Sequence, residues 1–128
     1  VKLKIERLSR VLKTVSHPKR LRILALLAEF DREVCVCEFV DALELPQYQV
    51  SQHLRELRNE NLVKGNREGT WVYYSLCEEG SEECKGLIEE LVKQIDRKDY
   101  LDQVEKLKER FKKRENGRCT VGYDEEKD

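Results

Sequence analysis

The chain has 128 residues, which suits one compact domain with room for an additional terminal element. It is 39% hydrophobic and 40% charged, a composition that supports a folded core and argues against a disordered chain. Its net charge of −1 lacks the strong positive balance of a nonspecific nucleic-acid binder. No apolar run approaches the ~20 residues that cross a bilayer, and the first residues do not resemble a signal peptide. We therefore expect a cytoplasmic protein with no membrane partner.

The first half of the chain is predicted to be helical. Apolar residues at helical spacing predict helices over residues 2–15 and 18–29. A third, shorter helix is expected within residues 33–43, with an irregular first turn because the residues of that turn favour extended backbone. After a tight connection at residues 44–46, the pattern predicts a fourth helix over residues 47–60.

The second half begins with a predicted β-hairpin. Residues 62–66 and 70–76 are predicted strands, joined by a turn at Glu68-Gly69. A long helical region follows from residue 80, with a break expected at residues 96–99 because the apolar stripes on either side are out of phase. Residues 116–128 are expected to form a flexible acidic tail.

This order of elements is the layout of a winged helix-turn-helix, a mostly α fold with a β-hairpin wing. In that fold the fourth helix enters the major groove of DNA and its first turns reach base edges. The side chains predicted to contact DNA from this helix are Gln47, Tyr48, Gln49, Ser51, Gln52, His53 and Arg55. Lys64, Asn66 and Arg67 of the hairpin suit contacts to phosphate or the minor groove. The alternative is a solvated polar face, and His53 alone fits a structural histidine equally well.

Cys35 and Cys37 form the strongest chemical feature, because two thiols two residues apart can chelate a soft ion. The alternative is that both are small buried apolar side chains. Residues i and i+2 lie about 200° apart on a regular helix, whereas they share a face in extended backbone. Binding of one ion by both sulfurs therefore predicts a distorted first turn in the third helix. We hypothesise that this distortion disfavours the DNA-binding geometry of the fourth helix.

Four segments give the chain a resemblance to the ArsR/SmtB family of metal-responsive repressors, over residues 1 to about 95. They are Ser16-His17-Pro18-Lys19-Arg20-Leu21-Arg22-Ile23-Leu24, Val34-Cys35-Val36-Cys37-Glu38, Val50-Ser51-Gln52-His53-Leu54-Arg55-Glu56-Leu57 and Trp71-Val72-Tyr73-Tyr74-Ser75-Leu76. The resemblance implies a homodimer formed largely by the first and last helices and bound to a double-stranded operator until an inducer releases it. Residues 1–98 would be the winged-helix DNA-binding and dimerisation domain, followed by an additional helix at 99–115 and the tail.

The resemblance implies arsenite or antimonite as the first choice of inducer, and no organic cofactor. Family members with this cysteine pair commonly carry another cysteine three residues on, where this sequence has Val40. Relatives that sense cadmium, lead or zinc add cysteines from an N-terminal arm, and residues 1–34 contain none. The third ligand could then be Cys119, Cys84, Cys77, an exogenous thiol or nothing. Cys119 is preferred because a tail could carry it across a dimer.

Cys77 and Cys84 are expected to be structural. The family's second metal site, on the final helix, uses Asp, His and Glu, and the two histidines of this chain, His17 and His53, lie elsewhere. No zinc or nickel site is therefore expected there.

Three alternatives to an arsenical repressor stay open at this point. One is a thiol redox or persulfide sensor, the second is a cadmium-, lead- or zinc-responsive repressor, and the third is a winged helix that contacts only proteins. An enzyme is not expected, because the sequence has no Cys-x-x-Cys motif in a βαβ setting, no phosphate-binding loop and no paired-histidine motif.

Overall fold

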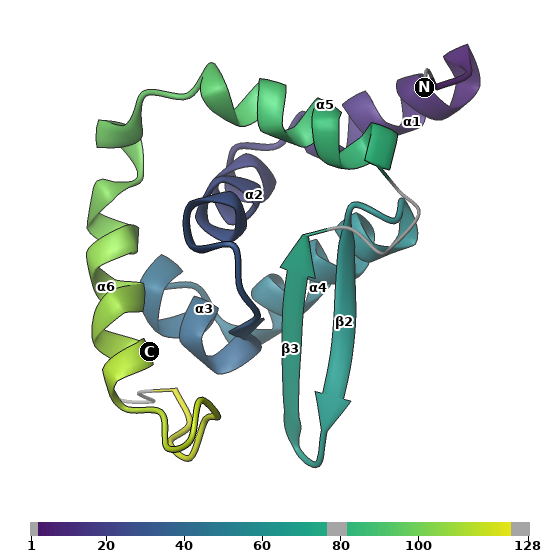
Figure 1. Ribbon diagram of the computed structural model, residues 1–128. Helices are drawn as coiled ribbons and strands as arrows, with labels where there is room; N and C mark the ends of the chain where they lie inside the picture. The colour runs from purple at the N-terminus through teal and green to yellow at the C-terminus, as the bar shows by residue number, and fades with distance from the viewer. Residues whose placement is uncertain (1–2, 77–81, 124–128) are drawn as a thin grey trace.

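The computed structural model describes residues 3–76 and 82–123 (Figure 1). The helices are α1 (Ile5–Val15), α2 (Pro18–Phe30), α3 (Val36–Leu43), α4 (Gln47–Asn59), α5 (Glu82–Lys93) and α6 (Leu101–Lys112), with a 3-10 turn η1 (Arg97–Asp99). The strands are β1 (Val34–Cys35), β2 (Val63–Glu68) and β3 (Trp71–Leu76). The prediction of a mostly helical winged helix-turn-helix with a hairpin wing is confirmed. Among the described residues, no helix is long and apolar enough to cross a membrane.

Local signals explain where the helices of the DNA-binding unit begin and end. The His17 side chain caps α2 by accepting from the Lys19 backbone N–H, and Pro18 occupies the first helical position. Helix α3 ends at Glu44, which adopts a left-handed conformation (φ 54°) and donates its N–H to the Val40 carbonyl. Two residues later α4 begins after Pro46, so the connection between the two helices is as tight as predicted.

The core lies where α2, α3, α4 and the hairpin meet, with α5 and α6 closing two sides (Figure 1). Fully buried apolar side chains of α2, α3, α4 and α6 build it, among them Leu24, Leu27, Phe39, Leu54 and Leu107. Burial of each such side chain contributes about 1.5–3 kcal/mol to folding. This packing fixes the angle between α3 and α4.

The sheet has three antiparallel strands in the order β1-β3-β2. The β2–β3 hairpin runs from Val63 paired with Leu76 to Glu68 paired with Trp71 and turns at Gly69, whose φ of 63° favours glycine. Strand β1, which the sequence did not predict, adds the pair Cys35 and Tyr73 on the other side of β3. The irregular first turn predicted for the helix at 33–43 is confirmed, because β3 holds residues 34–35 in a ladder and the regular helix begins after them.

The C-terminal part folds back over α3. The predicted break at 96–99 is occupied by η1, where the Asp96 carboxylate accepts from the Lys98 N–H, and α6 then runs beside α3 (Figure 1). Residues 116–123 are not the mobile tail that was predicted, because Cys119 is buried and its backbone N–H donates to the Tyr73 hydroxyl at 2.9 Å. Residues 124–128 and Cys77 lie outside the described residues.

Candidate metal site and DNA-facing surface

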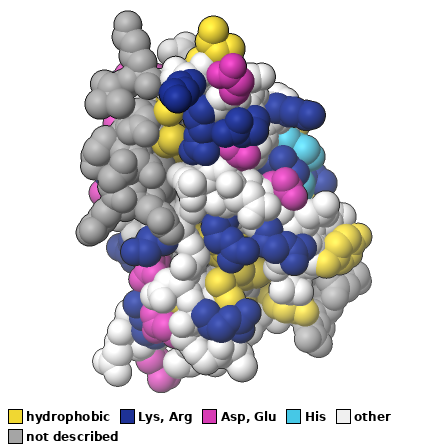
Figure 2. Space-filling view, turned by 90° about the vertical axis from the view of Figure 1, so that its right-hand side faces the viewer, with side chains coloured by type: hydrophobic (Ala, Val, Ile, Leu, Met, Phe, Trp, Pro, Cys, Tyr) yellow, Lys and Arg dark blue, Asp and Glu magenta, His cyan; other side chains and the backbone are white. Residues whose placement is uncertain are grey.

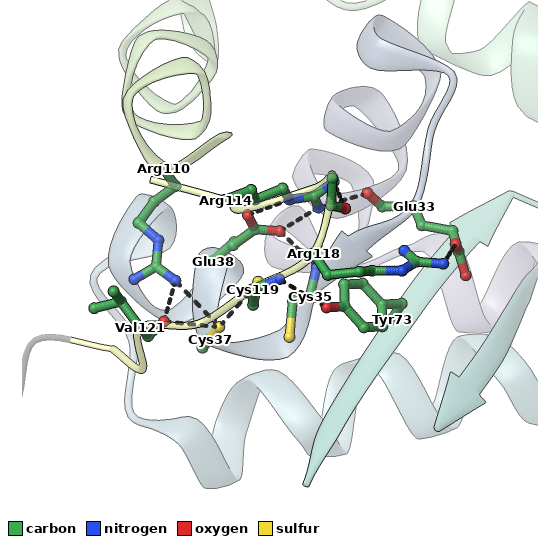
Figure 3. Close-up of polar contacts among 11 residues, drawn as sticks. Glu33, Cys35, Cys37, Glu38, Tyr73, Arg110, Arg114, Arg118, Cys119 and Val121 are labelled. Carbon is green, nitrogen blue, oxygen red and sulfur yellow. Dashed lines mark hydrogen bonds and ion pairs between the residues drawn. The ribbon is translucent and has the colours of Figure 1, made fainter. Parts of the chain in front are cut away.

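Three cysteines meet at one end of the sheet: Cys35 from β1, Cys37 from the first turn of α3 and Cys119 from the segment after α6 (Figure 3). Their three sulfurs all lie within 4.8 Å of one another, and Cys37 Sγ is 3.8 Å from Cys119 Sγ. The three residues are only 1%, 6% and 6% exposed. A buried set of three thiols suits a soft, three-coordinate ion.

The backbone brings Cys35 and Cys37 together without distorting a helix. Cys35 is the residue before α3 and is extended (φ −78°, ψ 149°), and its N–H donates to the Glu38 carboxylate at 2.8 Å. Cys37 is already helical. The predicted departure from a regular first turn is therefore confirmed, because Cys35 is extended and the change from strand to helix between the two residues turns both sulfurs to the same side. The hypothesis that ion binding at this turn disfavours the DNA-binding geometry of α4 stays a prediction.

Cys119 reaches this pair from its own chain, which differs from the expected reach across a dimer. Its backbone is held by the Tyr73 hydroxyl, and Arg118 lies over the Tyr73 ring, 4.5 Å from its centre. Arg118 also pairs with Glu33 and Glu68 at 3.1 and 2.9 Å. Cys84 lies apart from the cluster, buried in the main core, where its sulfur accepts from Arg7. This position agrees with the structural role expected of it.

Two arginines that sequence reasoning did not select hold the thiol cluster against α6. Arg114 makes a two-pronged ion pair with the fully buried Glu38, at 2.8 and 2.6 Å. Arg110 is 5% exposed, pairs with Asp41 at 2.6 Å and donates to Cys37 Sγ at 3.2 Å. Their spacing of four residues puts both on one face near the end of α6, and this was the signal available in the sequence.

Contacts among the sulfurs shift the pKa values of Cys35 and Cys37 in opposite directions. Hydrogen bonds from Cys119 and then from Cys37 lower the pKa of Cys35, whereas contacts with Cys119 and Cys35, together with burial, raise the pKa of Cys37. A thiolate is the form that binds a metal or metalloid. The lowered pKa favours the thiolate form of Cys35.

Helix α4 presents most of the predicted DNA-contacting residues to solvent. Gln47, Tyr48, Gln52 and Arg55 are exposed, and Gln49 and Ser51 are partly exposed. Lys64, Asn66 and Arg67 are exposed on β2. On the face seen in Figure 2, Lys and Arg side chains gather around a patch of hydrophobic ones.

His53 is the exception among these residues. It is 7% exposed, its Nδ1 accepts from Arg20 Nε at 3.1 Å, and its ring centre lies 4.6 Å from that of His17. Burial first, and then the charges of His17 and Arg20, lower the pKa of His53. This geometry favours the structural alternative for His53 over contact with a base.

A cavity of about 660 Å³ separates α4 from the hairpin. Gln47, Ser51 and Arg55 line it from α4, and Asn66 and Arg67 line it from β2. Cys35 and Cys37 also line this groove. The candidate DNA-contacting residues and the thiol pair therefore border one continuous space.

Comparison with known proteins assigns the family. The model of the family described as "Bacterial regulatory protein, arsR family" matches residues 17–64, from the start of α2 into β2. An uncharacterized HTH-type transcriptional regulator of Methanocaldococcus jannaschii is 39% identical over 88 residues, covering 69% of this chain and 98% of that protein. The chain belongs to the arsR family of bacterial regulatory proteins.

The chain aligns with a smaller part of other arsR-family relatives. The arsenic resistance transcriptional regulator ArsR1 of Pseudomonas putida is 42% identical over 66 residues, which are 52% of this chain and 51% of that regulator. Among solved structures, the homodimeric winged helix-turn-helix DNA-binding domain of a possible ArsR-family regulator from Mycobacterium bovis has a TM-score of 0.59. It is 30% identical and covers 68% of this chain and 76% of that chain. This arsR-family chain is therefore a winged-helix transcriptional regulator.

Proposed function

We propose that the chain is a homodimeric repressor that binds double-stranded operator DNA and releases it when trivalent arsenic or antimony binds Cys35, Cys37 and Cys119. The observation that carries this proposal is the buried cluster of three sulfurs within 4.8 Å. The similarity to an arsenic resistance regulator supports the same ion class.

The reaction needs no oxidant or reductant. Arsenite, As(OH)₃, exchanges its three hydroxyls for three thiols, so that three As–O bonds break, three As–S bonds form and each thiol proton leaves in a water molecule. The product is neutral and three-coordinate. A divalent ion held by the same three thiolates keeps a net negative charge in a buried site, which costs free energy. This difference favours a trivalent ion over cadmium, lead or zinc.

The DNA-binding half of the proposal rests on α4 and the hairpin. Gln47, Gln49 and Ser51 offer hydrogen bonds to base edges, and Arg55 can pair with guanine or phosphate. Lys64 and Arg67 would bind phosphates from the wing. A dimer would present two such helices to two half-sites. The exposed apolar side chains of α1, Ile5 at 83% and Leu12 at 44%, suit packing against a second copy.

A gel shift on a DNA duplex that the chain retains from a random pool tests the proposal, with arsenite, antimonite, cadmium, lead and zinc titrated separately. We expect arsenite and antimonite to release the wild-type chain at the lowest concentrations. Cys35→Ser and Cys37→Ser should bind DNA and no longer release it, and Cys119→Ser should need more ion. Cys84→Ser is the matched control, since its thiol lies outside the cluster. Failure of every ion to release the DNA would refute metalloid sensing.

A thiol redox sensor is the second candidate, and the 3.8 Å between Cys37 Sγ and Cys119 Sγ favours it. Peroxide would convert this pair to a disulfide, since two thiols and one H₂O₂ give one disulfide and two waters. Peroxide treatment without any ion separates the two candidates. DNA release by peroxide and not by arsenite, with a Cys37–Cys119 link found by peptide mapping, would select the redox sensor.

A further inference from the structure

We propose that Arg110 is a positioning residue that makes Cys119 a ligand of the same site as Cys35 and Cys37. This inference rests on the proposed function of the thiol cluster. Arg110 contacts both α3 and the segment that carries Cys119. Its Nη1 donates to Asp41 Oδ2 of α3 at 2.6 Å and to the Gly122 carbonyl at 2.9 Å. Nη2 donates to the Val121 carbonyl at 2.7 Å and to Cys37 Sγ at 3.2 Å (Figure 3).

These contacts place the guanidinium between α3, which carries Cys37, and the segment that carries Cys119. The Val121 and Gly122 carbonyls follow Cys119 by two and three residues, so holding them fixes where the Cys119 thiol can lie. Asp41 orients the guanidinium from α3, and the contact with Cys37 Sγ places it beside the thiol pair. A planar guanidinium can serve these four acceptors together, whereas a lysine ammonium has only three donors and no fork geometry.

The test compares Arg110→Met and Arg110→Lys with Cys119→Ser, using arsenite as the probe. Two quantities are measured: the arsenite dissociation constant, and the number of thiols that arsenite protects from alkylation, counted by mass. We expect both Arg110 variants to bind arsenite about 10- to 100-fold more weakly, as for other residues that orient metal ligands. They should also lose the protection of Cys119 and keep that of Cys35 and Cys37. Lys112→Met on the same helix is the matched control, because within the described part of the chain the ion pair of Lys112 is with the exposed Glu109.

The double variant Arg110→Met/Cys119→Ser separates positioning from general stability. If Arg110 acts through Cys119, the double variant binds arsenite no more weakly than Cys119→Ser alone. Arg110→Lys keeps a cation beside Asp41 and guards against loss of the fold. Protection of all three thiols at wild-type affinity in Arg110→Met, or additive losses in the double variant, would overturn the inference while leaving the proposed function intact. A wild-type chain with no thiols protected by arsenite would overturn both.

A separate observation, the groove between α4 and the hairpin, carries a second inference. We infer that inducer and operator reach the protein through this one groove, so that bound DNA blocks access to the thiols. Cys35 and Cys37 line the groove together with Gln47, Arg55 and Arg67. On the other side of the cluster, the hollow beside Cys119 is too small to admit a water molecule. DNA that spans α4 and the wing would close the mouth of the groove over the thiols. This inference also rests on the proposed function.

The kinetics of arsenite uptake test the shared groove. The absorption of the arsenic–thiolate bonds reports the uptake. The rate of uptake by the free chain should rise in proportion to the arsenite concentration. For the chain bound to a duplex retained from a random pool, the rate of uptake should level off at the dissociation rate of that duplex. The reason is that only the free chain can bind arsenite. A duplex that the chain does not retain serves as the control and should leave uptake unchanged. Equal uptake by free and bound chain would overturn the shared groove without affecting the proposed function.

Discussion

The ion pair between Glu38 and Arg114 should be a major source of stability for the C-terminal part of the fold. The Glu38 carboxylate is fully buried and accepts three hydrogen bonds: two from Arg114, at 2.8 and 2.6 Å, and one from the Cys35 N–H at 2.8 Å. Arg114→Met removes two of these three donors and leaves a buried charge without its counter-ion. Breaking a buried pair in this way costs about 3–5 kcal/mol.

That cost is large for a domain of this size. Small domains unfold with a free energy of about 5–15 kcal/mol, so Arg114→Met should remove roughly a fifth or more of it. At about 3–4 °C per kcal/mol, the melting temperature should fall by roughly 10–20 °C. Urea unfolding followed by circular dichroism measures the change, with an unchanged m value as the sign of an intact cooperative fold.

Two control variants sharpen this prediction. Arg118→Met removes ion pairs at a side chain that is 42% exposed, and it should cost about 1 kcal/mol or less. The double variant Glu38→Leu/Arg114→Leu removes both charges and should be more stable than Arg114→Met, although the Cys35 N–H loses its acceptor. An Arg114→Met protein within about 1 kcal/mol of wild type would refute the reasoning.

Three further predictions concern His53, the wing and Gly65. The pKa of His53 is lowered in the folded state, so the unfolded chain takes up the proton first as the pH falls below about 6.5. The free energy of unfolding should therefore decrease below that pH. Urea unfolding between about pH 7.5 and 5 measures this decrease, which should be smaller in His53→Gln. Lys64→Ala combined with Arg67→Ala should weaken binding to all DNA sequences and reduce the slope of log affinity against log salt by about 2, whereas an unchanged slope would remove these residues from the phosphate contacts. Gly65→Ala puts a methyl group 3.1 Å from Tyr74 Cε1, so the ring must shift and unfolding should become easier by about 1 kcal/mol, measured by thermal melting.

The DNA-binding unit could be predicted from local sequence patterns. Local patterns were sufficient because the signals lie within or beside each element: Pro18 starts α2, Pro46 precedes α4, and the β-forming residues after Gly69 mark the second strand of the hairpin. The buried apolar positions of α4 follow helical spacing, which leaves its polar residues facing outward. The pair Cys35 and Cys37 was also recognisable as a chelating motif without any structure.

The meeting of the three thiols depends on contacts between distant parts of the chain. Cys35 is extended because Tyr73, far along the chain, pairs with it in the sheet, and no local pattern encodes that contact. Cys119 lies beside the pair because Arg110 and Arg114 tie the end of α6 to Asp41 and Glu38 of α3. Such ion pairs join residues about 70 positions apart. Composition and periodicity report local preference and burial, and neither specifies which distant charges become partners.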